Sequence, residues 1–228
     1  MFDFDPEQIK GLLFAIPGIL LALSIHEFSH GYMAYKMGDP TAKNCGRLTL
    51  NPIKHIDLFG LIAMLLVHVG WAKPVPINSR NFKRPRLGLA LTSIAGPVAN
   101  LLTAFVGAML FYVVHIAFFA QLNDGNEVVI GVYNILYSLI YVNIGLAVFN
   151  LIPIPPLDGS RILDSFLPLK AMLAYHKYER AISIVLMLLL VFGIISPFIG
   201  IAVNFIGGLF EKIAYTICIT VYSLIINL

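Results

Sequence analysis

Charged side chains are scarce in this sequence. Asp, Glu, Lys and Arg make up 12% of the 228 residues, while 59% of the residues are hydrophobic and the mean hydropathy is +0.87. A soluble domain carries about twice that share of charge, so too few polar groups remain to cover a surface in water. The composition excludes an ordinary soluble globule, a disordered chain and a nucleic-acid-binding module. It predicts an all-α polytopic membrane protein.

Cysteine is nearly absent as well, and the N-terminus is acidic rather than basic. Cys45 and Cys218 lie far apart in the sequence and form neither a disulfide framework nor a metal-binding CxxC pair. The first ten residues carry Asp3, Asp5 and Glu7 where a secretory signal peptide would be basic, and no small-residue cleavage site follows. We therefore expect the first apolar segment to stay in the mature protein, within a single membrane-embedded domain over residues 1–228.

Long apolar stretches predict about five transmembrane helices, because a bilayer core needs about 20 apolar residues per helix. The stretches cover residues 9–37, 87–120, 128–151, 181–205 and, after Glu211 and Lys212, 213–228. The apolar run at 58–71, which contains His68, is too short to span and predicts a re-entrant hairpin. Residues 47–50 and 72–78 beside it read as strands and predict a small membrane-associated β element, with Pro74 and Pro76 restricting the second to an edge.

Basic residues are concentrated in two of the predicted loops. Nine of the fifteen Lys and Arg residues lie between Lys36 and Arg86, and four more lie between Arg161 and Arg180. Because basic loops stay on the cytoplasmic side, both should face the cytoplasm, which places the N-terminus outside. The sequence therefore predicts a multi-pass protein of the cytoplasmic membrane.

Ionisable residues inside the first predicted span form a metal-binding pattern. His26 and His30 are four residues apart, about 40° around a helix, so both imidazoles can reach one metal ion. Such residues cost a few kcal/mol each when ionised in a bilayer, which favours a functional site over a packing cluster. Zinc suits these ligands, and Glu27 can accept a proton from the water that the metal activates and pass it to the leaving amine.

Two histidines leave such a site one protein ligand short. Asp158 is the candidate, because Pro153, Pro155 and Pro156 must end the third span and leave an unwound segment that can turn a carboxylate inward. The predicted topology also places it at the depth of His30. Asp164 is the alternative, but we expect it to lie further into the basic loop and to be solvated.

Together the two motifs resemble the site-2 protease family of intramembrane zinc metalloproteases. The likeness rests on His-Glu-Phe-Ser-His at 26–30 and Asn-Leu-Ile-Pro-Ile-Pro-Pro-Leu-Asp-Gly at 150–159, and it extends to stretches at 38–42, 46–52, 70–76 and 95–100. The latter resemble the compact bacterial branch, and no segment has room for a PDZ or CBS domain. The resemblance implies one Zn²⁺ per chain held by His26, His30 and Asp158, with Glu27 as general base. It also implies cleavage of single-span membrane proteins or signal-peptide-like substrates near the cytoplasmic face.

Other residues are candidates for supporting roles. Asn150 matches a family asparagine that contacts the substrate or the oxyanion, although it can also cap its helix. The segment with Pro74 and Pro76 can clamp an unwound substrate by β-augmentation, or it can be a plain connector. Three residues interrupt the second span and favour close packing or support of the first helix over direct substrate contact: Gly96, Pro97 and Asn100.

Two other functions use the same residues. A metal or proton transporter could employ His26, Glu27, His30 and Asp158, but transporters commonly show repeated halves, and none is visible here. A catalytically silent membrane scaffold is the third possibility. The lipid bilayer is a partner in all three, and nucleic acid in none.

Overall fold

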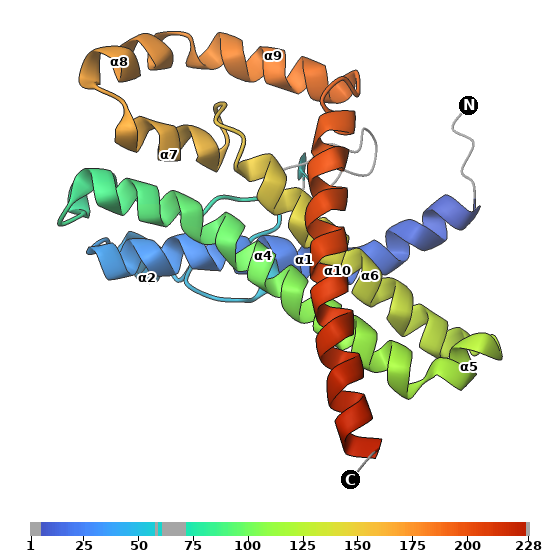
Figure 1. Ribbon diagram of the computed structural model, residues 1–228. Helices are drawn as coiled ribbons and strands as arrows, with labels where there is room; N and C mark the ends of the chain where they lie inside the picture. The colour runs from blue at the N-terminus through green and yellow to red at the C-terminus, as the bar shows by residue number, and fades with distance from the viewer. Residues whose placement is uncertain (1–5, 58, 61–71, 227–228) are drawn as a thin grey trace.

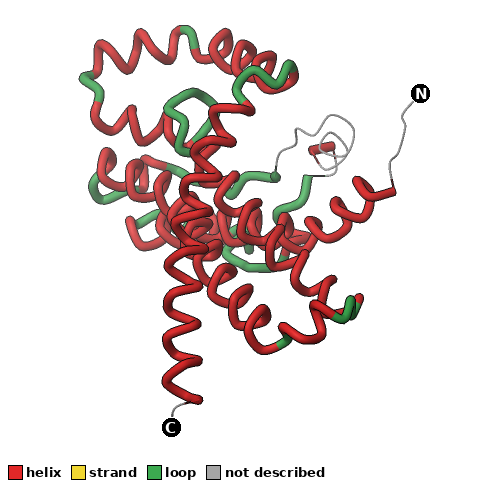
Figure 2. The backbone as a smooth tube through the Cα atoms, turned by 45° about the vertical axis from the view of Figure 1, so that its right-hand side comes forward, coloured by secondary structure: helices red, strands yellow, loops and turns green. Residues whose placement is uncertain are grey.

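The computed structural model describes residues 6–57, 59–60 and 72–226, and helices dominate these residues (Figures 1 and 2). In chain order the elements are α1 (Pro6–Met37), α2 (Thr41–Asn44), two short 3-10 turns (Pro52–Lys54 and Ser79–Asn81), α4 (Pro85–Ala117), α5 (Phe119–Asn123), α6 (Glu127–Asn150), α7 (Asp158–Phe166), α8 (Leu169–Lys177), α9 (Glu179–Val191) and α10 (Ser196–Ile226).

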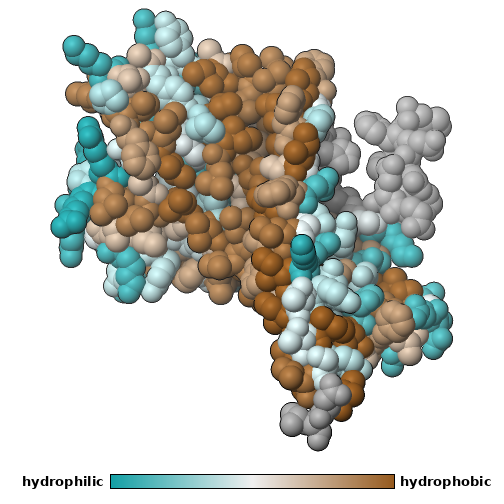
Figure 3. Space-filling model, in the orientation of Figure 1, coloured by the Kyte–Doolittle hydropathy of each residue, from teal (hydrophilic) through white to brown (hydrophobic). Residues whose placement is uncertain are grey.

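Four of these helices are long and apolar enough to cross a membrane: α1 from Leu13 onward, α4, α6 and α10. Hydrophobic side chains cover the middle of the face in Figure 3, whereas hydrophilic ones gather at its left edge, near α2, the start of α4 and the turn from α7 to α8. An apolar surface of this extent fits lipid rather than water. The chain is therefore a multi-pass membrane protein, and the first three predicted spans correspond to α1, α4 and α6.

The last two predicted spans are wrong. The apolar run at 181–205 is broken, because α9 ends at Val191 and the chain turns at Gly193, whose φ of 70° suits glycine. The next helix, α10, then passes through Glu211 and Lys212 without interruption. Glu211 is accommodated because its Oε1 accepts a hydrogen bond of 2.9 Å from the Tyr141 hydroxyl of α6. One long helix thus takes in the end of one predicted span and residues 213–226 of the next.

The core forms where α4, α6 and α10 meet, and α1 packs against both α4 and α6. Small residues in α4 allow the close approach, since a Cβ added to Gly107 would lie 3.3 Å from the Ile140 side chain of α6. The buried side chains of this core are Ala104, Ala108, Phe111, Ile140, Ile144 and Ala214. Helix α10 crosses α4 and α6 steeply, and its C-terminal end projects beyond them (Figures 1 and 2).

The predicted β element is not present as a sheet in the described part of the chain. Residues 47–50 and 72–78 contain no strand there, and one isolated antiparallel bridge joins Ile56 to Ala72. Pro74 and Pro76 lack the N–H groups that a ladder needs, which explains why pairing goes no further. The predicted re-entrant hairpin, including His68, lies outside the described residues except for 59 and 60. We call residues 72–78 the strap.

The strap is held across α1 by hydrogen bonds to side chains and loops. The Asn78 N–H donates to Asp39 Oδ2 at 2.7 Å, and the Lys73 N–H donates to the His55 carbonyl at 2.8 Å. Burial opposes the charge of Asp39, but hydrogen bonds from Thr41, Asn81 and the Asn78 N–H outweigh it and lower the pKa of this carboxyl. An ionised Asp39 therefore anchors the strap at its C-terminal end.

Candidate metal centre

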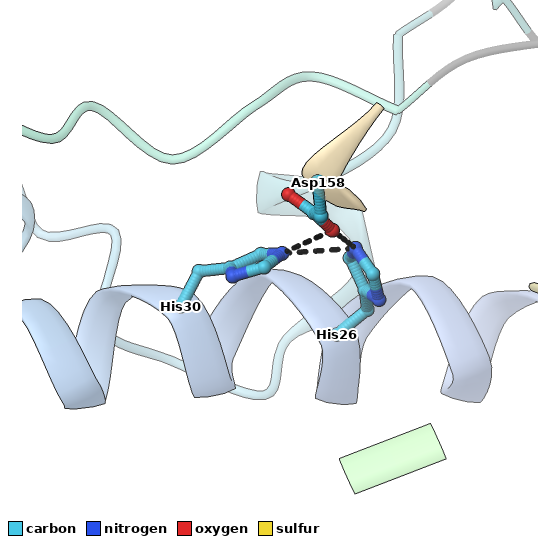
Figure 4. A group of neighbouring side chains, drawn as sticks. All are labelled: His26, His30 and Asp158. Atoms are coloured by element: carbon cyan, nitrogen blue, oxygen red, sulfur yellow. Dashed lines mark hydrogen bonds and ion pairs between the residues drawn. The ribbon is translucent and has the colours of Figure 1, made fainter. Parts of the chain in front are cut away.

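Three side chains from two distant parts of the chain converge on one point. His26 Nε2 and His30 Nε2 lie 2.9 Å apart, and Asp158 Oδ2 lies 3.2 and 3.1 Å from them, respectively (Figure 4). A tetrahedral zinc ion with bonds of about 2.0–2.1 Å separates its ligand atoms by about 3.3 Å. The observed triangle is thus close to the size that zinc requires.

Local backbone structure explains why these groups meet. His26 and His30 project from the same side of α1, one turn apart, as helical spacing dictates. Asp158 is the first residue of α7, directly after the proline-rich turn that ends α6. A Cβ on Gly159 would lie 2.4 Å from the carbonyl oxygens of Leu151 and Ile152, so only glycine lets α7 begin against this turn.

The hydrogen-bond partners of the two Nδ1 atoms determine which ring nitrogen of each histidine carries the hydrogen. His26 Nδ1 lies 2.7 Å from Asn100 Oδ1, and His30 Nδ1 lies 2.7 Å from the Thr92 carbonyl oxygen. Both oxygens can only accept, so each Nδ1 carries the hydrogen and each Nε2 presents a lone pair inward. Two lone pairs and a carboxylate oxygen then face one another, an arrangement that a cation stabilises. The donor set therefore fits a zinc ion, with outer partners of the usual kind.

Gly96 makes room for the two rings. A Cβ at this position would lie 2.5 Å from His30 Nε2 and 2.7 Å from His26 Cε1, closer than atoms can approach. The following Pro97 is buried within α4. The structure thus brings Gly96 and Asn100 of α4 against the two histidines.

Glu27 lies beside the metal ligands and contacts the strap. Its Oε2 accepts a hydrogen bond of 2.7 Å from the Val75 N–H. Pro74 and Pro76 have no N–H, so Val75 supplies the one backbone donor of this Pro-Val-Pro tripeptide. The other carboxylate oxygen of Glu27 has no hydrogen-bond partner among the described residues and remains available.

A cavity of about 580 Å³ opens beside this cluster. Its walls include Glu27 and the three candidate ligands, the strap through Pro74, Val75 and Ile77, and α9 through Ser183, Leu186, Met187 and Leu190. Asn150 also lines it, while its Nδ2 donates to the Leu146 carbonyl of its own helix at 2.9 Å. An amide carries two N–H donors, so one remains for a ligand in the cavity.

The prediction that Asp164 is solvated is wrong. Asp164 is buried, and its Oδ2 lies 2.9 Å from His176 Nε2 in α8. The other ring nitrogen of His176 lies 3.0 Å from Glu179 Oε2, so this histidine joins α7, α8 and α9. The cluster is separate from the candidate ligands and holds α7, α8 and α9 together. No local sequence pattern indicates this cluster, because Asp164 and His176 lie on different helices that only the folded chain brings together.

Comparison with known proteins places the site in context. The model of peptidase family M50 matches residues 14–193, a range that includes all three candidate ligands and Glu27. "Putative zinc metalloprotease YwhC" of Bacillus subtilis is 46% identical over 153 residues, which cover 66% of this chain and 67% of YwhC. "Putative zinc metalloprotease Rip2" of Mycolicibacterium smegmatis is 30% identical over 159 residues, or 68% of this chain and 58% of Rip2.

A third relative is also named a zinc metalloprotease. "Zinc metalloprotease MJ0392" of Methanocaldococcus jannaschii is 31% identical over 193 residues, which cover 82% of this chain and 45% of that protein. The chain thus spans about two thirds of YwhC and less of the other two. The comparison with solved structures found no match.

Proposed function

This chain belongs to peptidase family M50 and is a zinc metalloprotease of the membrane, and from that premise we propose that it hydrolyses peptide bonds within or beside transmembrane segments of other proteins. The observation that carries the proposal is the convergence of two imidazole lone pairs and a carboxylate, next to a free glutamate oxygen, within apolar helices. Bound there, zinc polarises the scissile carbonyl and activates water. In this proposal His26, His30 and Asp158 hold the ion.

Glu27 acts as the general base. Its free oxygen accepts the proton of the attacking water and later delivers that proton to the leaving amine. The Val75 N–H holds the other oxygen at 2.7 Å and so keeps the carboxylate oriented toward the cavity. The spare N–H of Asn150 stabilises the negative charge that develops on the carbonyl oxygen when water adds to the carbonyl carbon.

The strap binds the substrate in extended form. A transmembrane helix must unwind before its carbonyls can be attacked, and each exposed backbone group costs several kcal/mol in lipid. Val75 and Ile77 line the cavity and lie on the same side of the extended strap, since alternate residues share a side. The Val75 carbonyl and the Ile77 N–H have no partner among the described residues, so both can pair with an unwound substrate strand.

The cut lies close to the cytoplasmic face, with the N-terminus of the chain outside. Support comes from the basic residues that precede α4 and that lie within and after α7, and from the position of Asp158 at the start of α7. Single-span proteins or remnant signal peptides are the substrates that such a site can reach, and the protein works in the cytoplasmic membrane. A zinc or proton transporter would use the same residues, but nothing in the described part of the chain favours it.

The variant Glu27→Gln tests this function directly. Purified in detergent, it should bind zinc as the wild type does and fail to cleave a single-span reporter, because glutamine cannot accept the proton. Glu127→Gln, at the exposed start of α6, is the matched control and should cleave normally. Cleavage by Glu27→Gln at the wild-type rate would refute the mechanism. Zinc flux into vesicles with no cleavage by the wild type would favour transport.

A further inference from the structure

Two fully buried asparagines lie behind the metal centre, one in α4 and one in α6. Asn100 and Asn143 are both 0% exposed, in helices whose residues are mostly apolar. A buried amide is costly unless it is hydrogen-bonded. We infer that Asn143 is a positioning residue for the metal centre, because it fixes the Asn100 amide, which in turn fixes the tautomer of His26.

The hydrogen bonds form a chain with a defined direction. Asn143 Nδ2 donates to the Leu139 carbonyl at 2.8 Å, which turns Asn143 Oδ1 toward α4. Asn100 Nδ2 donates to that oxygen at 2.8 Å and to the Ala22 carbonyl at 3.0 Å. Asn100 Oδ1 then faces His26 Nδ1 at 2.7 Å and can only accept from it.

Backbone carbonyls at the ends of this chain make the reverse orientation unfavourable. If the Asn100 amide were flipped, its oxygen would face both the Ala22 carbonyl and Asn143 Oδ1, and its NH₂ group would face His26 Nδ1. That nitrogen would then have to accept, and the hydrogen would move to Nε2, where the metal must bind. Two backbone carbonyls, one in α1 and one in α6, thus determine which nitrogen of His26 is free for zinc.

The two histidines differ in this respect. His30 Nδ1 donates directly to the Thr92 backbone carbonyl, which no side chain has to orient. His26 depends on two side chains in series. Changes at Asn143 should therefore weaken metal binding through His26 and leave the contact between His30 and Thr92 intact.

The inference rests on the proposed zinc site and is tested by zinc affinity, measured on the full chain in detergent by competition with a chromogenic chelator. Loss of an outer-shell partner costs about 10–100-fold in metal affinity. Asn100→Leu should raise the Kd for zinc within that range, and Asn143→Leu should raise it by about tenfold, at the lower end. Ile144→Val, which trims the adjacent fully buried side chain, should leave the Kd within about twofold, since packing alone does not orient an amide.

The double variant separates positioning from packing. If Asn143 acts through Asn100, then Asn143→Leu should have no further effect on the Kd in the Asn100→Leu background. An unchanged Kd in Asn143→Leu alone, or a full additional loss in the double variant, would overturn the inference. Thermal unfolding of each variant without metal checks that the helices still assemble. A wild-type chain that binds no zinc would instead refute the metal site itself.

Discussion

Replacing Gly96 by alanine would place a methyl group against both histidine rings. The added Cβ would lie 2.5 Å from His30 Nε2, whereas ordinary contact begins at 3.4 Å, so the ring would have to move by about 0.9 Å. Neither ring can simply rotate away, because each is held through Nδ1, one by Asn100 and one by the Thr92 carbonyl. Zinc sites tolerate deviations of about 0.2 Å in ligand distance. The substitution should therefore weaken the metal site itself.

The size of the effect follows from the cost of overpacking. Inserting a methyl group into a packed site costs about 1–3 kcal/mol, which corresponds to a rise of about 5- to 150-fold in the Kd for zinc. Chelator competition on the purified protein measures this, and cleavage of the reporter at limiting zinc should fall in parallel.

Gly145→Ala is the matched control, since it lies in α6 with no atom within 4 Å of its added Cβ. It should bind zinc normally and gain helix stability of about 1 kcal/mol. Wild-type zinc affinity in Gly96→Ala would refute the geometry proposed for the two rings.

Three further predictions address other parts of the molecule. Asp158→Asn should lose most of its bound zinc, as measured by metal analysis after dialysis, whereas Asp164→Asn should keep it; equal zinc content in the two variants would contradict the ligand assignment. The hydrogen bond with Glu179 and the charge of Asp164 raise the pKa of His176 above its ordinary value of about 6.5. The contribution of His176 to stability is therefore complete below about pH 6.5, and it is lost as the pH rises through the raised pKa. The protection factors of the α8 amides, which correct for the rise of intrinsic exchange with pH, should fall over that range in the wild type and show no such step in His176→Gln. Protection factors that rise with pH would contradict the sign. Ile77→Pro removes one backbone donor. Loss of one hydrogen bond in a dry site corresponds to a fall of about tenfold or more in rate, so reporter cleavage should slow by that factor. Ile77→Val should cleave normally, and equal rates for the two variants would exclude pairing through this N–H.

The convergence of His26, His30 and Asp158 was predictable because its signals are local. The spacing of His26 and His30 places both on one side of a helix, and the prolines at 153–156 force the break that delivers Asp158. The first three spans were predictable for a similar reason, since length and hydropathy suffice where loops are polar.

Other features depend on partners that no local pattern reveals. The turn at Gly193 lies within an apolar run, so a hydropathy profile does not reveal it. The Glu211 carboxylate accepts a hydrogen bond from a hydroxyl on another helix, which the sequence does not indicate either. Thr92 supports His30 through a backbone carbonyl, which any residue could supply. The burial of Asp164 follows from a histidine twelve positions away that only the folded chain brings near.

The distance between the candidate ligands along the chain has a consequence for biosynthesis. His30 and Asp158 are 128 positions apart, so the ribosome must deliver most of the polypeptide before both are present in the bilayer. A nascent chain that stalls before α7 carries two histidines and no carboxylate to complete the site. Metal capture at this candidate site therefore cannot be completed before the start of α7 has been made, while α8, α9 and α10 are still to follow.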